Sequence, residues 1–500
     1  MKNLKFFASF LSAAAMCAFA FADDSVDITK FSLKDGTKVA AVVYVPTNAT
    51  GKVAAELTLS PYKRTRIAKH MSKKNYDKIG FANVGVDWRG TGNSEGKFDP
   101  YGPDFPVDAG DIVDNVIATQ PWCNGKVFMV GGSFPGATQF AAMRAGAKKL
   151  VACAPSVMTL DPYSLYFSNG VRVDIFKSGW HIKFAGQKAY DELASHTDPN
   201  DPYWTSRADL GKLDECKASV FYQGGWFDMM GAETMSTYNT LRRNGRRVFL
   251  RQGPWAHGVN VFSGDINYKM LGGRVTEDLE LDFLHKIVRG EKPSTDGMPG
   301  QILLYVMGRN EWCFVDAWPV SGTMPTDWNF GKGSKSFKHD PKNPVPSCGG
   351  RLTPGGGQME QSKIAARKDV ISFEGETLTD DLDIIGDVYA KVVLSSTANS
   401  ADVAIKLIDV YPDGKAYNVV DSICRARDLK PGEKRVLEFK VDSTAYRFFK
   451  GHKLRVDIAG SSARHYEVNP AAGETTIYAD GSKFILPVIP SGNKNVIPMK

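Results

Sequence analysis

The sequence predicts a doubly wound α/β domain followed by an all-β domain. Three observations support this fold class: nearly continuous apolar runs that suit strands covered on both faces, helical stretches between them, and a C-terminal third of strand-like segments without a long amphipathic helix. Alternation of strands with helices is typical of a parallel sheet. A chain of 500 residues is also longer than one core usually supports, so we expect more than one domain.

In the α/β part, seven apolar runs are expected to form strands. They lie at residues 38–46, 53–62, 81–87, 126–132, 150–156, 218–225 and 246–253. Helical stretches are expected at residues 105–120, 137–147 and 277–290. Between the fifth and sixth strands, residues 159–216 are richer in aromatic and polar side chains, which indicates an insertion lying over the edge of the sheet.

The last third of the chain differs from the α/β part in its composition and in the pattern of its apolar residues. Residues 334–357 are rich in proline and glycine and predict a linker or long crossover. Beyond them, strand-like segments separated by turn signals lie at residues 387–396, 402–414, 435–441, 453–461 and 482–489. We therefore expect a β-sandwich, preceded by a linker, in residues 334–500.

Composition excludes several classes of function. The net charge of +7 arises from 62 basic and 55 acidic residues without a long basic run, which argues against a nucleic-acid partner. There is no CxxC pair and no HExxH motif, so the sequence predicts neither a metal site nor a cofactor. Six of the seven cysteines lie beyond the first 22 residues, and their spacing selects no disulfide pairing.

The N-terminus has the pattern of a secretory signal. A basic start, MKNLK, precedes an apolar run and an Ala-x-Ala site, which predicts cleavage after Ala22 and a signal peptide at residues 1–22. A membrane anchor is the alternative, but the apolar run is short for a spanning helix. We expect an exported protein, periplasmic or secreted, without a stable membrane anchor after cleavage.

A serine flanked by glycines follows the fourth of these strands. Ser133 stands where a strand, a tight turn and a helix would meet, and such a corner exposes a nucleophilic hydroxyl. Gly131, Gly132 and Gly136 allow the close backbone approach that the corner needs. Pro135 occupies a position where glycine is usual, although proline is tolerated in the first turn of a helix. The alternative is a tight turn without a catalytic role.

The partners of a catalytic serine on an α/β sheet are expected in the order serine, acid, histidine. Asp228 follows a buried strand and could hold an imidazole in the required tautomer, whereas Asp214 precedes that strand. His257 lies in a loop just past the next strand, where catalytic residues are commonly placed. His285 is the other candidate, but it belongs to an amphipathic helical pattern where a packed or solvated histidine is usual.

The glycine-rich loop at residues 87–98 resembles a phosphate-binding loop only in composition. Its spacing lacks the Gly-Lys-Ser/Thr ending of a P-loop, since Phe98 follows Lys97. We therefore expect a tight loop after a strand that supports the serine corner through Arg89.

Several motifs occur together in one order: SPYKRT, DWRGTGNSEG, PWCNGKVFMVGGSFPG, GGWFD, GPWAHG and, in the last domain, LTDDLDIIGDVYAKVVLSS. With them the chain resembles the superfamily of X-prolyl dipeptidyl-peptidases, cocaine esterases and α-amino acid ester hydrolases over essentially its whole length beyond residue 22. The resemblance implies an α/β-hydrolase domain at residues 23–158 and 217–333, a helical cap at residues 159–216, and a C-terminal jelly roll, galactose-binding-like, at residues 334–500.

The resemblance also implies the roles of individual residues. Ser133 becomes the nucleophile, Asp228 the acid and His257 the general base, and the glycine expected three positions after the serine is present. The backbone N–H of Phe134, directly after the serine, is one expected oxyanion donor. The second donor in the family is the tyrosine of a Pro-Tyr motif, which corresponds here to Tyr62.

One departure from the family bears on the substrate. The amino acid ester hydrolases carry acidic residues two and three positions after the catalytic aspartate, where this sequence has Met230 and Gly231. Glu233 is the nearest acid and lies further along the chain. A free α-amino group therefore has no evident partner, so we expect the acyl group of the substrate to be recognised instead.

These observations favour an exported serine hydrolase that cleaves small or medium esters, with amides as a further class, through a Ser133 acyl-enzyme. An X-prolyl dipeptidyl-peptidase is the first alternative, and it would need an acidic anchor for the substrate N-terminus. A non-catalytic carbohydrate-binding protein with a relic triad is the alternative from another class. The sequence does not determine the oligomeric state.

Overall fold

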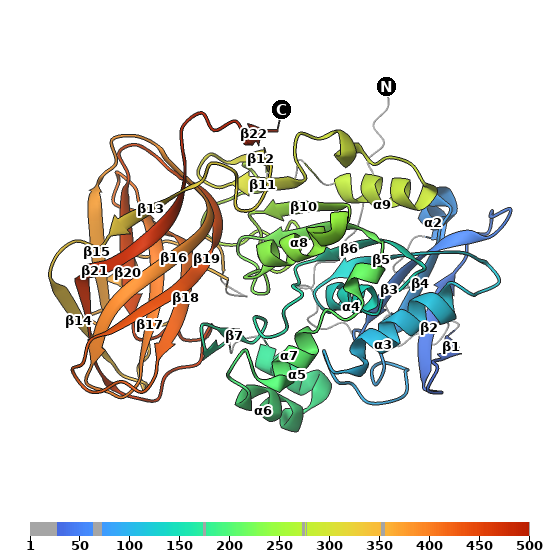
Figure 1. Cartoon of the computed structure of the whole chain (residues 1–500), viewed down its shortest axis with the longest axis horizontal. Helices are drawn as coiled ribbons and strands as arrows, with labels where there is room; N and C mark the ends of the chain where they lie inside the picture. The colour runs from blue at the N-terminus through green and yellow to red at the C-terminus, as the bar shows by residue number, and fades with distance from the viewer. Residues whose placement is uncertain are drawn as a thin grey trace.

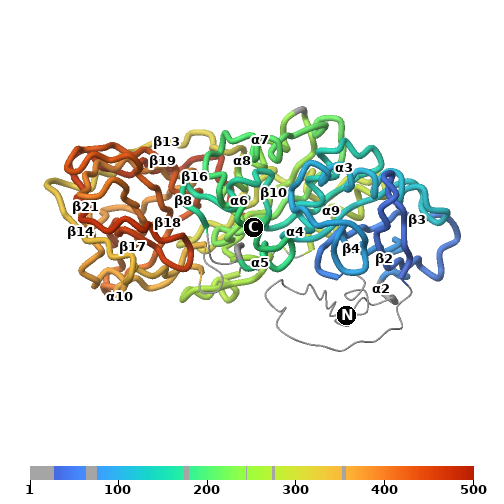
Figure 2. The backbone as a smooth tube through the Cα atoms, turned by 90° about the horizontal axis from the view of Figure 1, so that it is seen from below, coloured from blue at the N-terminus to red at the C-terminus, as the bar shows by residue number. Residues whose placement is uncertain are grey.

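The computed structural model describes residues 28–63, 73–173, 177–272, 276, 278–351 and 356–499. The predicted signal peptide at residues 1–22 lies outside these described residues. An α/β part and a β-sandwich lie side by side along the long axis of the molecule (Figures 1 and 2). Within the described part of the chain, no helix is long and apolar enough to cross a membrane.

An eleven-stranded sheet forms the centre of the α/β part. In sheet order, its strands are β1 (Thr29–Ser32), β2 (Lys38–Tyr44), β4 (Ala82–Asp87), β3 (Val53–Ser60), β5 (Cys123–Gly132), β6 (Leu150–Ser156), β9 (Ser219–Gly225), β10 (Val248–Gly253), β11 (Ile302–Val306), β12 (Glu311–Val315) and β22 (Val496–Pro498). The neighbours from β4 to β11 pair in parallel, while β1, β2, β12 and β22 pair antiparallel at the two ends. All seven predicted strands are present, so the α/β fold is confirmed.

Helices cover the sheet. They are α2 (Lys73–Ile79), α3 (Asp104–Asp111), which continues as a π-helical turn (Ile112–Ile117), α4 (Phe134–Arg144), α8 (Thr234–Arg242), α9 (Leu279–Arg289) and the short helical turns Leu213–Glu215, Arg243–Gly245 and Ser294–Gly297. Every residue of β4 and β10 is buried, as expected for central strands. The close contact of α3 with α4 depends on Gly110, whose Cβ would stand 2.6 Å from that of Ala145.

The segment that connects β6 to β9 lies over one edge of the sheet, and we call it the cap (Figure 1). It contains β7 (Phe167–Ser168), β8 (Val171–Arg172), α5 (Lys177–Ala185), α6 (Gln187–Ser195) and α7 (Pro202–Ala208). Its hairpin also packs on the sandwich, because Val171 and Val173 share a buried cluster with Ala404, Ile423 and Tyr466. The cap therefore contacts both parts of the molecule.

The sandwich consists of two antiparallel sheets that pack face to face. The first contains β13 (Met324–Asn329), β14 (Ser334–His339), β21 (Gly473–Ile489), β16 (Leu382–Ser396) and β19 (Arg435–Phe448). The second contains β15 (Val370–Thr377), β20 (Lys453–Ala459), β17 (Ala401–Val410) and β18 (Ala416–Ala426). A short helix, α10 (Ser362–Ala365), precedes β15. The predicted all-β domain is confirmed.

The boundaries of the sandwich differ from the expected ones. β13 pairs with β21, so the sandwich begins before residue 334. β14 lies inside the segment predicted as a linker, residues 334–357, and also pairs with β21. At the other end, β22 leaves the sandwich and pairs with β12 in the large sheet. The last residues of the chain therefore connect the two parts.

Candidate active site

Ser133 stands at the corner between β5 and α4. Its backbone has φ 60° and ψ −131°, a conformation that costs an L-residue free energy and that marks many functional sites. Its N–H donates to the Ser156 carbonyl at 2.9 Å, which ties the corner to the end of β6. A Cβ on Gly132 would lie 2.6 Å from Ser156 Oγ, and one on Gly131 equally close to the Cβ of Pro135. Glycine is therefore required at both positions, as predicted, because neighbouring residues lie too close to leave room for a Cβ.

Pro135 does not interrupt the corner. It lies in the first turn of α4, where a backbone N–H would have no intrahelical acceptor. The next residues, Gly136 and Ala137, already donate to the Ser133 carbonyl at 2.8 and 3.1 Å. The helix therefore begins directly after the serine, and the N–H of Phe134 belongs to its unsatisfied N-terminal end.

Asp228 and His257 both meet Ser133 at the carboxyl ends of the parallel strands. Asp228 follows β9 in a tight turn, and its Oδ1 lies 2.9 Å from Nδ1 of His257, which follows β10. Nε2 of the same imidazole lies 3.1 Å from Ser133 Oγ. The exposed fractions are 6% for Ser133, 0% for Asp228 and 5% for His257. The three residues predicted from the sequence thus form one buried chain of hydrogen bonds.

The chemistry of the partners fixes the direction of these hydrogen bonds. An ionised carboxylate can only accept, so Nδ1 of His257 donates to Asp228. Nε2 of the neutral ring is then an acceptor for the Ser133 hydroxyl proton. Asp228 is itself oriented, because its Oδ1 also accepts the Met230 N–H at 2.8 Å.

Glycines of the GGWFD and GPWAHG motifs make room for a buried tryptophan. Trp255 is fully buried, and a Cβ on Gly225 or Gly253 would overlap its ring or backbone. Because these glycines end β9 and β10, the acid and base loops can pack directly on each other. The other candidate base, His285, lies on α9 with its ring centroid 5.2 Å from that of Phe81, and burial lowers its pKa. It is a packed histidine outside this chain of hydrogen bonds.

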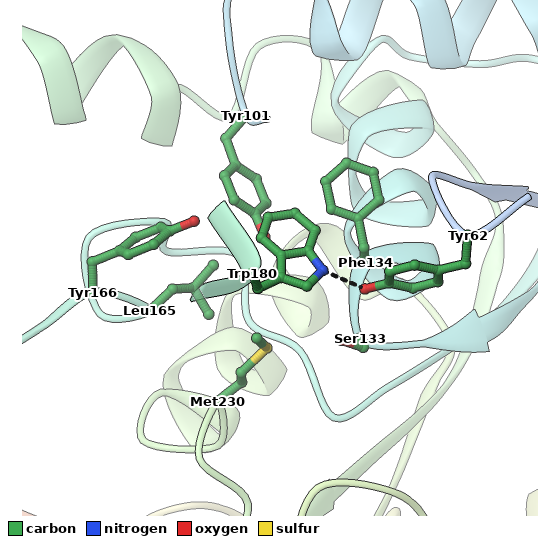
Figure 3. A pocket seen from close by; sticks show the side chains of 8 residues that line it. All are labelled: Tyr62, Tyr101, Ser133, Phe134, Leu165, Tyr166, Trp180 and Met230. Carbon is green, nitrogen blue, oxygen red and sulfur yellow. Dashed lines mark hydrogen bonds between the residues drawn. The ribbon is translucent and has the colours of Figure 1, made fainter. Parts of the chain in front are cut away.

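A pocket opens above Ser133 (Figure 3). Its lining consists of Tyr62, Tyr101, Ser133, Phe134, Leu165, Tyr166, Trp180 and Met230. Tyr62 follows β3, and its N–H donates to Ser60 Oγ at 3.1 Å. The two residues expected to stabilise an oxyanion, Tyr62 and Phe134, therefore line the same pocket as the serine.

The pocket is apolar and its polar groups are neutral. Burial raises the pKa of the Tyr101 and Tyr166 hydroxyls well above their ordinary value, so both phenols remain protonated near neutral pH. No carboxylate and no ammonium is among the residues that line it in the described part of the chain. Met230 lines the pocket at a position where the amino acid ester hydrolases carry an acid. The side chains that line the pocket are therefore suited to binding an uncharged group of a substrate.

Two residues at the site were not predicted from the sequence. Trp180, on α5 of the cap, donates its indole N–H to the Tyr62 hydroxyl at 3.0 Å. Arg351, which precedes β15, donates to the Asp228 carbonyl at 2.8 Å and forms a bidentate ion pair with Asp442 of the sandwich. Both contacts join distant parts of the chain, so no local sequence pattern predicts them.

The loop at residues 87–98 supports the corner differently from the expectation. Arg89 pairs with Asp108 on α3 and with Asp35, and not with the serine corner. Contact with the corner comes from Phe98, whose ring centroid lies 5.4 Å from that of Phe134. Aromatic packing rather than an arginine thus connects this loop to α4.

Among the described residues, no group of three or more histidine, cysteine, aspartate or glutamate side chains could hold a metal ion. The six described cysteines are all free.

Comparison with known proteins identifies the family. The signature described as X-Pro dipeptidyl-peptidase (S15 family) matches residues 35–191 and 179–259, and that of the X-Pro dipeptidyl-peptidase C-terminal non-catalytic domain matches residues 298–493. The chain belongs to the X-Pro dipeptidyl-peptidase and cocaine esterase family. It is therefore a hydrolase, and the predicted resemblance is confirmed.

Individual relatives agree with this assignment. The hydrolase is 27% identical over 531 residues to the cocaine esterase of Rhodococcus sp. (strain MB1 Bresler), covering 88% of this chain and 91% of the relative. Among solved structures, an α-amino acid ester hydrolase matches with a TM-score of 0.78 at 21% identity, over 95% of this chain and 99% of that one. An aminopeptidase from a marine sediment archaeon, Thaumarchaeota archaeon, matches with a TM-score of 0.77 at 19% identity, over 95% and 98%. The two structural matches show the shared fold.

Proposed function

We propose that the hydrolase cleaves small or medium carboxylic esters, with amides as a further class, through an acyl-enzyme on Ser133. The observation that carries the proposal is the buried chain of hydrogen bonds from Asp228 through His257 to Ser133 at the base of a pocket. A serine hydroxyl becomes an effective nucleophile when a base accepts its proton, and this arrangement supplies that base.

The geometry supports a two-step acyl transfer. Ser133 Oγ attacks the substrate carbonyl carbon while its proton passes to Nε2 of His257, and Asp228 stabilises the imidazolium that forms. The carbonyl oxygen becomes an oxyanion, for which the Phe134 N–H and the Tyr62 hydroxyl are the donors. The imidazolium then protonates the leaving alkoxide, which departs. In the second step, water attacks the acyl-enzyme while His257 takes its proton. The imidazolium then returns this proton to Ser133 Oγ as the bond to the acyl carbon breaks and the carboxylic acid leaves.

The lining of the pocket supports recognition of an uncharged acyl group. Aromatic rings and the side chains of Leu165 and Met230 surround the space next to Ser133. A substrate ammonium would lose its hydration there without gaining an ionic partner, which is costly. Glu233 is not among the residues that line the pocket, and its carboxylate accepts from Ser236 on α8. We therefore do not favour release of dipeptides from N-termini.

Export is also part of the proposal. It rests on residues 1–22, where a basic start, an apolar run and an Ala-x-Ala site follow one another. The mature hydrolase would begin at Asp23 and act in the periplasm or outside the cell. Expression of the full chain followed by N-terminal sequencing of the periplasmic and secreted fractions tests this, and uncleaved protein retained inside the cell would contradict it.

Covalent labelling tests the mechanism. Treating the purified hydrolase with a fluorophosphonate and mapping the modified peptide by mass spectrometry should place the adduct on Ser133. His257→Ala should slow labelling by several orders of magnitude, because the serine loses its base. His285→Ala is the matched control, since that imidazole is packed on α9, and it should label at the wild-type rate. An adduct elsewhere, or none on Ser133, would overturn the assignment.

A substrate panel separates the ester hydrolase from the peptidase alternative. We expect p-nitrophenyl esters with neutral acyl groups to be cleaved with a higher kcat/KM than the same esters carrying a free α-amino group. Preferential cleavage of a Gly-Pro anilide would instead favour an X-prolyl dipeptidyl-peptidase, and the acyl-recognition proposal would then be wrong.

A further inference from the structure

The Tyr62 hydroxyl is held by a residue of the cap. Trp180 Nε1 lies 3.0 Å from the Tyr62 oxygen, and the dashed line in Figure 3 marks this hydrogen bond. The two residues come from different parts of the fold, since Tyr62 follows β3 of the sheet and Trp180 belongs to α5. The cap therefore contributes a donor directly to the pocket that contains Ser133.

The indole of Trp180 is fixed by aromatic packing. Its ring centroid lies 5.6 Å from that of Phe134, 6.0 Å from that of Phe98 and 5.2 Å from that of Phe184. Phe184 also packs edge to face on the Tyr62 ring, with centroids 5.6 Å apart. Such contacts on several sides restrict the orientation of a large side chain. The N–H of Trp180 is thus held in place toward the phenol oxygen.

The direction of the hydrogen bond determines what Tyr62 can do. An indole N–H can only donate, so the phenol oxygen must be the acceptor in this contact. The hydroxyl proton of Tyr62 is consequently excluded from the side that faces Trp180. In Figure 3, the dashed line from Trp180 reaches the Tyr62 oxygen from one side, and Ser133 lies below that oxygen in the view. An accepted hydrogen bond also polarises the O–H group and makes it a stronger donor.

We propose that Trp180 is a positioning residue for the oxyanion donor. Its indole N–H occupies one side of the Tyr62 oxygen, so that the phenolic proton is directed to the carbonyl oxygen of a substrate bound at Ser133. This inference rests on the proposed function, in which Tyr62 stabilises the oxyanion. It gives the cap a role in the chemical step in addition to covering the pocket.

A double-mutant cycle tests the coupling. Tyr62→Phe removes the donor and should lower kcat about 100-fold, as loss of an oxyanion donor commonly does. Trp180→Phe keeps an aromatic ring but removes the N–H, and it should lower kcat about fivefold with little change in KM. In the Tyr62→Phe background, Trp180→Phe should lower kcat less than twofold, because the proton that it orients is already absent.

Two further measurements separate positioning from packing. Phe184→Leu removes an aromatic contact with Tyr62 but no hydrogen bond, and should lower kcat less than Trp180→Phe does. The rate of fluorophosphonate labelling of Ser133, whose adduct carries a tetrahedral centre with an oxygen at the oxyanion position, should follow the same pattern as kcat. Thermal unfolding of each variant shows whether the fold is retained.

The outcomes distinguish this inference from the proposed function. If Trp180→Phe lowers kcat equally in both backgrounds, or changes only KM, the indole acts by packing or by contacting substrate, and the positioning role is wrong. If the wild-type hydrolase neither turns over esters nor forms the Ser133 adduct, the proposed function itself fails. If the wild-type enzyme is active and the effects of the two substitutions are coupled in the double-mutant cycle, both the proposed function and the positioning role are supported.

Discussion

His181 shows how burial of one imidazole makes the stability of the hydrolase depend on pH. The residue is 2% exposed on α5, and its Nδ1 lies 3.0 Å from the Tyr166 hydroxyl. Burial, with a smaller contribution from Arg207, lowers the pKa of His181 from its ordinary 6.5 to about 4. Near neutral pH the ring is therefore uncharged in the folded protein.

The sign of the pH dependence follows from this shift. Between pH 6.5 and 4 the unfolded chain binds a proton at His181 that the folded protein does not, so the free energy of unfolding falls as the pH falls. From pH 7 to pH 5 this residue should account for a loss of about 2 kcal/mol. Urea unfolding of the wild type and of His181→Gln at both pH values measures it. Between pH 7 and pH 5, His181→Gln should lose about 2 kcal/mol less of its free energy of unfolding than the wild type does. An equal loss in both proteins would contradict the assignment.

At the scale of single elements, the corner between β5 and α4 depends on the space around its glycines. Gly131 and Gly125 both belong to β5 and both have positive φ, at 130° and 84°. A Cβ on Gly131 would lie 2.6 Å from Pro135 Cβ, whereas one on Gly125 would meet nothing within 4 Å. A side chain would therefore cause backbone strain at both positions, but it would clash with a neighbouring residue only at Gly131.

This difference predicts unequal effects of the same substitution. Gly125→Ala should cost about 1 kcal/mol of stability through backbone strain alone. Gly131→Ala should cost about 2 kcal/mol more, because the rigid ring of Pro135 cannot move away. Urea unfolding measures both, and fluorophosphonate labelling of Ser133 should slow only in Gly131→Ala. Equal losses of stability would show that the corner relaxes around the added methyl group.

The elements that sequence analysis could predict carry local signals. Apolar runs predict buried strands, and the serine corner combines a strand, small residues and a helix start within a few positions. The loops that hold Asp228 and His257 follow strand ends, which the same pattern locates. For these reasons the α/β fold was predictable, and the structure brings the three candidate site residues together.

Other elements lack such a signal. β13 has the sequence MPTDWN and is almost wholly exposed, so no apolar periodicity distinguishes it from a linker. β22 has only three residues. The contacts of Trp180 with Tyr62 and of Arg351 with Asp228 join residues 118 and 123 positions apart. They depend on how the cap and the sandwich are placed on the sheet, which a single sequence does not specify.

At the scale of the whole molecule, the sandwich is attached to the catalytic part by backbone hydrogen bonds. Met307, just after β11, accepts from Arg447 at 2.8 Å and donates to Ala445 at 2.9 Å, both on β19. Buried side chains of the two parts also form one continuous hydrophobic cluster. The sandwich therefore packs as an integral part of the structure around the site.

Arg351 extends this attachment to the acid of the site. Arg351 is 8% exposed, and its guanidinium forms a bidentate pair with Asp442 on β19 and donates to the carbonyls of Gly225 and Asp228. A Cβ on Gly231 would lie 2.5 Å from Arg351 Nη1. Gly231 is one of the positions where the amino acid ester hydrolases carry an acid. Here the glycine leaves room for an arginine that fixes the turn holding Asp228.

Breaking this pair should affect both stability and chemistry. Arg351→Met leaves the Asp442 carboxylate buried without its cation and removes the donor from the Asp228 turn, so stability should fall by about 3 kcal/mol or more. The Ser133 labelling rate of the folded variant should fall about tenfold, since a displaced acid orients His257 less well. Arg425→Met is the matched control, because Arg425 forms a bidentate pair with Asp402 inside the sandwich. It should lower stability but leave labelling unchanged, whereas slowed labelling in both variants would mean that loosening of the sandwich, and not the contact with Asp228, limits the site.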